Sequence, residues 1–112
     1  FPAGELKHGS IALIEDGTKV FTIATQSKLV EKTASNSQEL TSRGAHVYSI
    51  GRAGDTLLEK SADKVIYVPN SLDVLMPVLT VIPEQLIAYY TSLAKGNDVD
   101  KPRNLAKSVT VE

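Results

Sequence analysis

Three short runs of β-branched and aromatic residues constrain the fold of this chain more than any other feature. They occupy residues 20–24, 46–50 and 64–68, and turn-forming residues flank them. Apolar runs of this length between turn signals are typical of buried β-strands. The sequence therefore predicts three strands, with room for a helix between the first two.

Residues 28–43 are predicted to form that helix. Leu29, Val30 and Leu40 recur at helical spacing, and Gly44 follows where helices commonly end. A strand, a helix and a second strand joined by short links indicate a parallel pair with a right-handed crossover. Residues 55–61 contain good helix formers and are expected to form a short helix before the third strand.

The C-terminal third begins with a strongly apolar segment. We predict a short helix over residues 72–80 and a longer one over residues 83–95, divided at Pro83 and ended by Gly96. The apolar stripe is broad, which predicts self-association or coverage by another chain segment. The segment is not expected to span a membrane, because it is interrupted by Asp73, Pro77, Pro83, Glu84 and Gln85.

Together these elements predict an α/β fold, a partial doubly wound arrangement of three layers. A short parallel sheet is flanked by helices, and an irregular C-terminal tail follows. Sheets of this class usually have five or more strands, and the chain starts at Phe1 without a Met, so we expect further strands upstream. Residues 1–96 are assigned to the domain and residues 97–112 to the tail.

The charge balance and the absence of cysteine exclude several classes of protein. The chain has 12 Lys and Arg residues against 13 Asp and Glu residues, a formal net charge of −1. Nucleic acids and anionic membranes are bound by clustered basic residues, and this composition gives no such signal. Without Cys, the chain can form neither disulfides nor thiolate metal sites.

His8 is the first candidate for chemistry. It lies in a charged cluster between Gly4 and Gly9, and an imidazole there could transfer protons near neutral pH. Because no partner residue specifies such a role, a surface histidine in a loop is the favoured interpretation. His46 begins a predicted strand and is interpreted as an exposed side chain at the strand end.

Polar residues follow the first and third predicted strands. They are residues 25–27, Thr-Gln-Ser, and residues 70–71, Asn-Ser. Open α/β sheets bind ligands at this edge, but helix capping is the alternative, and we favour capping at both places. Residues 51–54 lack the Lys and Ser/Thr of a phosphate loop and are predicted to form a turn.

Lys107 is the candidate in the tail. A solvated lysine is the ordinary interpretation, although a partly buried lysine can form a Schiff base with a carbonyl substrate. Residues 102–112 hold too many apolar side chains for a disordered solubilising tail. We therefore expect the tail to dock onto another surface.

Two segments carry a family resemblance. Residues 4–9 read Gly-Glu-Leu-Lys-His-Gly, and residues 98–112 read Asp-Val-Asp-Lys-Pro-Arg-Asn-Leu-Ala-Lys-Ser-Val-Thr-Val-Glu. Together they resemble the glutamine:fructose-6-phosphate amidotransferase (glucosamine-6-phosphate synthase) family, and Ser10 is one small departure. The order of elements between them resembles the second sugar isomerase (SIS) half of that enzyme. The resemblance implies a flavodoxin-like SIS fold over residues 1–96 and an active-site tail over residues 97–112.

The resemblance implies roles for three residues. His8 would assist opening of the sugar ring in the site of the partner subunit. Lys107 would form a Schiff base with the open-chain ketose, and the backbone of Ala106 would contact the sugar. The carboxylate base, the phosphate loops and the glutaminase domain of the family lie outside this chain, so we expect the isolated chain to be inactive. Glu5 is not assigned as the missing base.

The resemblance also implies partners and a location. Fructose 6-phosphate and glucosamine 6-phosphate would bind to the full enzyme, which would be cytoplasmic, form a homodimer or otherwise self-associate, and need no cofactor, metal ion, nucleic acid or membrane. The alternative is a non-catalytic SIS-type module that binds a phosphosugar or mediates dimerisation, and this module would not need Lys107. A simple aldose-ketose isomerase is less favoured, because the tail resembles the amidotransferase family.

Overall fold

The structure is a computed structural model, and it describes residues 1–101. Contacts within the chain divide it into two units, Phe1–Thr80 and Val81–Glu112. The first unit holds the sheet and the helices packed on it. The second unit holds most of the long C-terminal helix.

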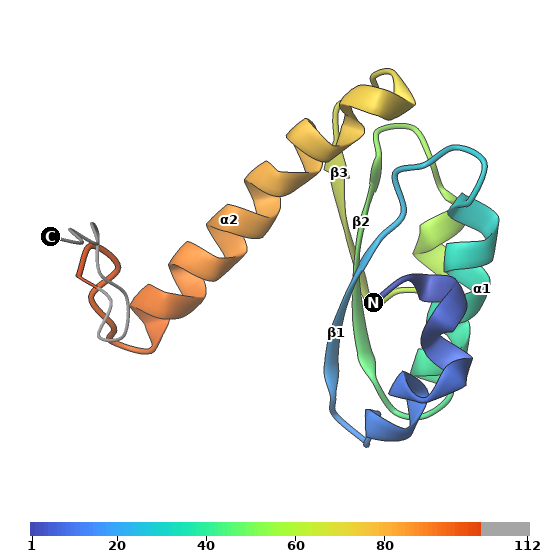
Figure 1. The fold of residues 1–112 in the computed structure, drawn as a ribbon, viewed down its shortest axis with the longest axis horizontal. Coiled ribbons are helices and arrows are strands. Elements are labelled where there is room, and N and C mark those ends of the chain that lie inside the picture. Colours follow the sequence, from blue (N-terminus) through green and yellow to red (C-terminus); the bar gives the residue numbers. More distant parts are fainter. Residues whose placement is uncertain (102–112) are drawn as a thin grey trace, which may run out of the picture. The chain divides into compact units, whose positions relative to one another are not determined.

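A three-stranded parallel sheet forms the centre of the first unit (Figure 1). Its strands are β1 (Lys19–Ile23), β2 (His46–Arg52) and β3 (Lys64–Val68), in the spatial order β1-β2-β3. Val20 lies opposite Val47, and Ile50 lies opposite Ile66. The three predicted strands and their parallel pairing are confirmed.

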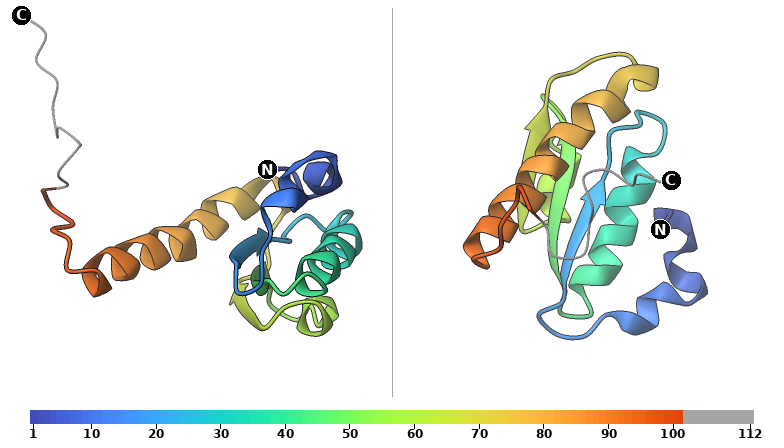
Figure 2. Two further views of the ribbon diagram at one scale, coloured as in Figure 1. Left: turned by 90° about the horizontal axis from the view of Figure 1, so that it is seen from below. Right: turned by 60° about the vertical axis from the view of Figure 1, so that its left-hand side comes forward.

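Helix α1 (Val30–Thr41) lies along one face of this sheet (Figure 2). Its buried residues are Val30, Thr33, Ser37 and Leu40. The short helix η3 (Leu57–Lys60) packs on the same face, where Leu58 is completely buried. The predicted helices at residues 28–43 and 55–61 are confirmed in kind, although both are shorter than expected.

Two 3-10 helices that were not predicted, η1 (Ala3–His8) and η2 (Ser10–Leu13), precede the sheet. Leu6 of η1 packs against the buried side chains of Leu40 and Val47. The segment around His8 was predicted to be a loop, because short 3-10 helices have no distinctive periodicity. Its position depends on the apolar contact of Leu6.

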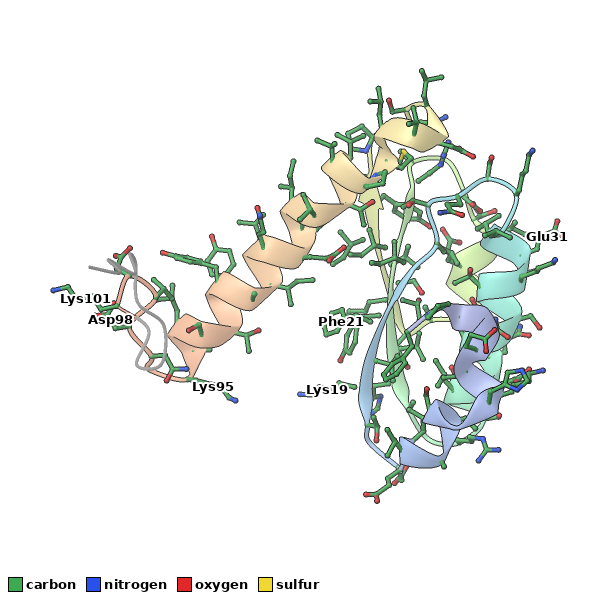
Figure 3. The ribbon with its side chains drawn as sticks, viewed as in Figure 1. Lys19, Phe21, Glu31, Lys95, Asp98 and Lys101 are labelled. Atoms are coloured by element: carbon green, nitrogen blue, oxygen red, sulfur yellow. The ribbon has the colours of Figure 1, made fainter. Side chains whose placement is uncertain are left out.

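The opposite face of the sheet is covered beside β2 and β3 within the first unit. Met76 is fully buried there against Ile50 and Val68. On the same face, Phe21 and Ile23 of the neighbouring strand β1 remain about half exposed. Figure 3 shows Phe21 pointing away from α1. Within the first unit, the face that carries α1 and η3 is therefore the more completely packed of the two.

The C-terminal segment differs from the prediction. A short helix η4 (Asp73–Leu75) leads directly into one helix, α2 (Met76–Ala94), with Pro83 in its interior. The predicted division into two helices at Pro83 is wrong. An interior proline removes the main-chain bond to the carbonyl four residues earlier, here that of Leu79, whereas two new helix ends would leave several backbone groups unpaired.

The helical stretch Asp73–Ala94 is long and apolar enough to cross a membrane, judged by length and composition alone. Its mean hydropathy is 1.2 over an 18-residue window, of which 11% is buried. The core helices of soluble proteins meet the same criteria. That this segment does not span a membrane stays a prediction.

The packing of η3 on the sheet gives the first testable prediction. Leu58→Ala leaves a cavity beside Gly51 and Val65, and we expect the free energy of unfolding to fall by about 2–5 kcal/mol. Leu72→Ala is the matched control, since Leu72 is 69% exposed, and it should change little. Denaturant unfolding of the 112-residue chain measures both. Equal effects of the two substitutions would contradict the packing described here.

Candidate functional site

The carboxyl ends of the three parallel strands lie at the same edge of the sheet. The loops that follow β1 and β3 meet there beside Arg52, the last residue of β2. Ligands of open α/β sheets bind at this edge, because the loops that follow the strands surround it.

Arg52, at the end of β2, joins the loops after β1 and β3 through its guanidinium group. Its Nε donates to the carbonyl oxygen of Thr25 at 2.6 Å, and its Nη1 donates to Asn70 Oδ1 and to the Ser71 carbonyl oxygen, both at 3.0 Å. Its Nη2 forms an ion pair with Asp73 Oδ1. The side chain of Arg52 is only 15% exposed. A single cation thus connects residues that lie far apart in the sequence.

Asp73 completes this network. Its Oδ2 accepts a hydrogen bond from the Ser27 hydroxyl at 2.9 Å, while its Oδ1 contacts Arg52. The hydrogen bond from Ser27, together with the charge and hydrogen bond of Arg52, lowers the pKa of the Asp73 carboxyl below its ordinary value of 3.8, although desolvation opposes the shift. The carboxylate is therefore ionised at neutral pH.

This arrangement corrects the predicted capping roles. The N-cap residues of α1 and η4 are Leu29 and Leu72, and neither helix start has a side-chain capping bond. Ser27 bonds to Asp73 instead, and Asn70 accepts from Arg52. The local sequence favoured capping, whereas Ser27 and Asn70 form hydrogen bonds with charged side chains that are distant in the sequence.

Arg52 was not among the site residues predicted from the sequence, and residues 51–54 were predicted to form a turn. However, β2 continues through Arg52, and only the residues after it turn, with Gly54 at a φ of +89°. A charged residue at the end of an otherwise buried strand was the available signal. Such a residue needs a partner at the sheet edge, because an unpaired buried charge is costly.

His8 lies elsewhere in the first unit, as the last residue of η1, and its side chain is exposed. Two contacts hold the 3-10 helix η1, which carries His8, against the rest of the first unit. Leu6 packs into the core, and Lys7 Nζ forms an ion pair with Glu39 Oε1 of α1 at 2.7 Å. The chain thus presents an imidazole to solvent from an anchored turn.

Ala106 and Lys107, the two other predicted site residues, lie outside the described residues. Within residues 1–101, no three His, Asp or Glu side chains lie close enough to hold a metal ion.

An open groove runs along the outer side of β1, between η1 and α1.

The sequence of residues 1–95 matches the SIS domain family. The chain belongs to this family. The fold of this chain is similar to that of a solved structure, the C-terminal domain of glucosamine-fructose-6-phosphate aminotransferase from Francisella tularensis. That structure has a TM-score of 0.78 and 32% sequence identity, over 88% of this chain and 28% of the solved one. The predicted SIS fold is confirmed.

Two curated relatives extend the similarity of this SIS chain to its last residue. The glutamine–fructose-6-phosphate aminotransferases (isomerizing) of Caldanaerobacter subterraneus subsp. tengcongensis and Clostridium tetani are 57% and 56% identical over all 112 residues. The predicted resemblance is confirmed, and it covers both motif segments. The SIS chain spans 18% of the length of each relative.

The Arg52–Asp73 pair predicts a specific response to acid. Because folding lowers the pKa of Asp73, its stabilising contribution is fully present above the unfolded pKa and is lost as the pH falls through the lower folded pKa. Between about pH 5 and about pH 3, the native chain should therefore lose more stability than Asp73→Asn. Urea unfolding at each pH measures the difference. Parallel pH profiles of the two proteins would contradict it.

Proposed function

We propose that the protein containing this chain makes glucosamine 6-phosphate from fructose 6-phosphate and glutamine. The observation that supports this most strongly is the 51–58% identity to aminotransferases of that name over essentially the whole chain. The identity extends through the tail, where a module serving only for binding would need no Schiff-base lysine. The chain contributes one part of the sugar isomerase half.

His8 is proposed to assist opening of the sugar ring. This step moves a proton from the anomeric hydroxyl to the ring oxygen, and an imidazole can accept and return a proton near neutral pH. The exposed position of His8 on the anchored turn η1 supports this role, since a side chain presented outward can reach a sugar held by a partner subunit. Leu6, Lys7 and Glu39 act as positioning residues.

Lys107 is proposed as the nucleophile of the Schiff base. Its neutral amine attacks the ketose carbonyl carbon, and the carbinolamine then loses water to form a carbon–nitrogen double bond. The backbone of Ala106 is proposed to contact the sugar beside it. We propose residues 1–96 as the SIS portion and residues 97–112 as the active-site tail, in a cytoplasmic enzyme that binds fructose 6-phosphate and glucosamine 6-phosphate.

The proposed roles of His8 and Lys107 predict a loss of activity in the full-length protein. We expect His8→Gln to lower the rate of glucosamine 6-phosphate formation by about 10²–10⁴-fold, as removal of an acid–base group does, and Lys107→Arg to abolish it. The measurement is product formation from glutamine and fructose 6-phosphate.

The matched controls are His46→Gln and Lys95→Arg, which change exposed residues of β2 and of the segment after α2. Both should retain activity. The 112-residue chain alone should form no product, because the base, phosphate loops and glutaminase of the family lie outside it. A fully active Lys107→Arg protein would refute the Schiff-base role of Lys107, and a native full-length protein that forms no product would favour the non-catalytic module.

We also propose self-association of the 112-residue chain through α2. In the second unit this helix exposes many large apolar side chains, namely Val81, Ile82, Leu86, Tyr89, Tyr90 and Leu93. An apolar surface of this kind is stabilised when a second copy covers it. The homodimer implied by the family resemblance is consistent with such coverage.

Sedimentation equilibrium tests this proposal. The native chain should form dimers or larger species at micromolar concentrations, and Leu86→Lys together with Tyr90→Lys should shift the chain toward the monomer by at least about tenfold in dissociation constant. Glu31→Lys, on the exposed side of α1, is the control for added charge. A native chain that stays monomeric at high concentration would refute the proposal.

A further inference from the structure

Arg52 and Ser27 present two donors to one point at the carboxyl edge of the sheet. The Nη2 of Arg52 and the hydroxyl of Ser27 both meet the carboxylate of Asp73, one at each oxygen. The remaining donors of Arg52 that the structure shows in use point to main-chain and amide oxygens. These hydrogen bonds orient the guanidinium without any contribution from Asp73.

The two donors suit an oxyanion in general. A guanidinium N–H donates to carboxylate and phosphate oxygens alike, and a serine hydroxyl donates to either. The edge at which they lie is the one where open α/β sheets take their ligands. In this chain the oxyanion at that place is a side chain of the chain itself.

The exposures of the two charged groups show which one an incoming ion would replace. The Arg52 side chain is 15% exposed, whereas the Asp73 side chain is 47% exposed. The carboxylate therefore lies on the solvent side of the guanidinium. A dissolved anion that approaches from solvent reaches the position of Asp73 first, and it finds that position filled by a charge of its own sign.

We propose that Asp73 closes an oxyanion site at the carboxyl edge of this sheet, and that its removal lets inorganic phosphate bind between Ser27 and Arg52. In the native chain the internal carboxylate excludes phosphate and phosphorylated ligands from this edge. Asp73 is thus a specificity-determining residue that leaves sugar-phosphate binding to other parts of the protein. The inference is independent of the roles proposed for His8 and Lys107.

The same contacts would be present if Asp73 served only as a structural clamp that holds the loops together. The test therefore needs a measurement that such a clamp would not change. Removing either partner of a clamp lowers stability whether or not phosphate is present. A closed site differs, because phosphate should restore what the Asp73 substitution removes. The interaction between the substitution and the phosphate concentration therefore decides between the two.

The experiment titrates inorganic phosphate into the 112-residue chain at constant ionic strength, with chloride as the balancing anion. The ³¹P line width and the thermal midpoint are followed up to about 10 mM phosphate, a range that detects millimolar dissociation constants. We expect no specific binding by the native chain. Asp73→Ala should bind phosphate at least about tenfold more tightly than the native chain and gain thermal stability as phosphate is added.

Asp63→Ala is the matched control. Asp63 is similarly exposed, at 43%, and accepts a hydrogen bond from the Val47 backbone, but it lies before β3, near the amino end of the sheet. Its removal should lower stability without creating phosphate binding. Adding Arg52→Gln to Asp73→Ala should abolish the phosphate response, and adding Ser27→Ala should weaken it.

Several outcomes would overturn the proposal. They are phosphate binding by the native chain as tight as that of Asp73→Ala, a response that survives Arg52→Gln, and an Asp73→Ala chain that folds but ignores phosphate. Asp73→Asn, which keeps the shape of the side chain and removes its charge, serves if Asp73→Ala does not fold by circular dichroism. A folded Asp73→Asn chain without phosphate binding would also refute the proposal.

Discussion

The parallel pairing of β2 with both of its neighbours determines how the first unit is arranged. Parallel strands need crossover connections, and two successive right-handed crossovers in the same direction lie on the same face of a sheet. Helix α1 and the short helix η3 accordingly cover one face together. On the other face, Met76 and its neighbours pack against β2 and β3 within the first unit, and Phe21 and Ile23 of β1 stay about half exposed.

The same pairing brings the loops after β1 and β3 to one edge, and Arg52 links them there. Its buried guanidinium would be costly without partners, and the loops after β1 and β3 supply oxygens to it. Asp73 adds the balancing charge directly before α2 begins. The edge that would ordinarily hold a ligand anion therefore holds a carboxylate that also fastens the start of the long helix to the sheet.

The errors of the sequence analysis have physical causes. Pro83 was expected to divide the C-terminal helix, but local propensity weighs less than the backbone hydrogen bonds that a break would lose. Ser27 was expected to cap α1, but its hydroxyl bonds to a carboxylate 46 residues away. In both cases the prediction used only the residues next to Pro83 or Ser27 in the sequence, and the interaction that decided the structure was not part of that local pattern.

The sequence by itself determined the three strands, the helix between the first two, and the family, because each depends on residues that are neighbours in the chain. The apolar runs and the segment around His8 can be recognised without knowing the fold. Only the tertiary structure decided that Ser27, Arg52 and Asp73 form one network. The physical reason is that parallel strands bring together the ends of loops that are about twenty or more residues apart, and no local pattern encodes that meeting.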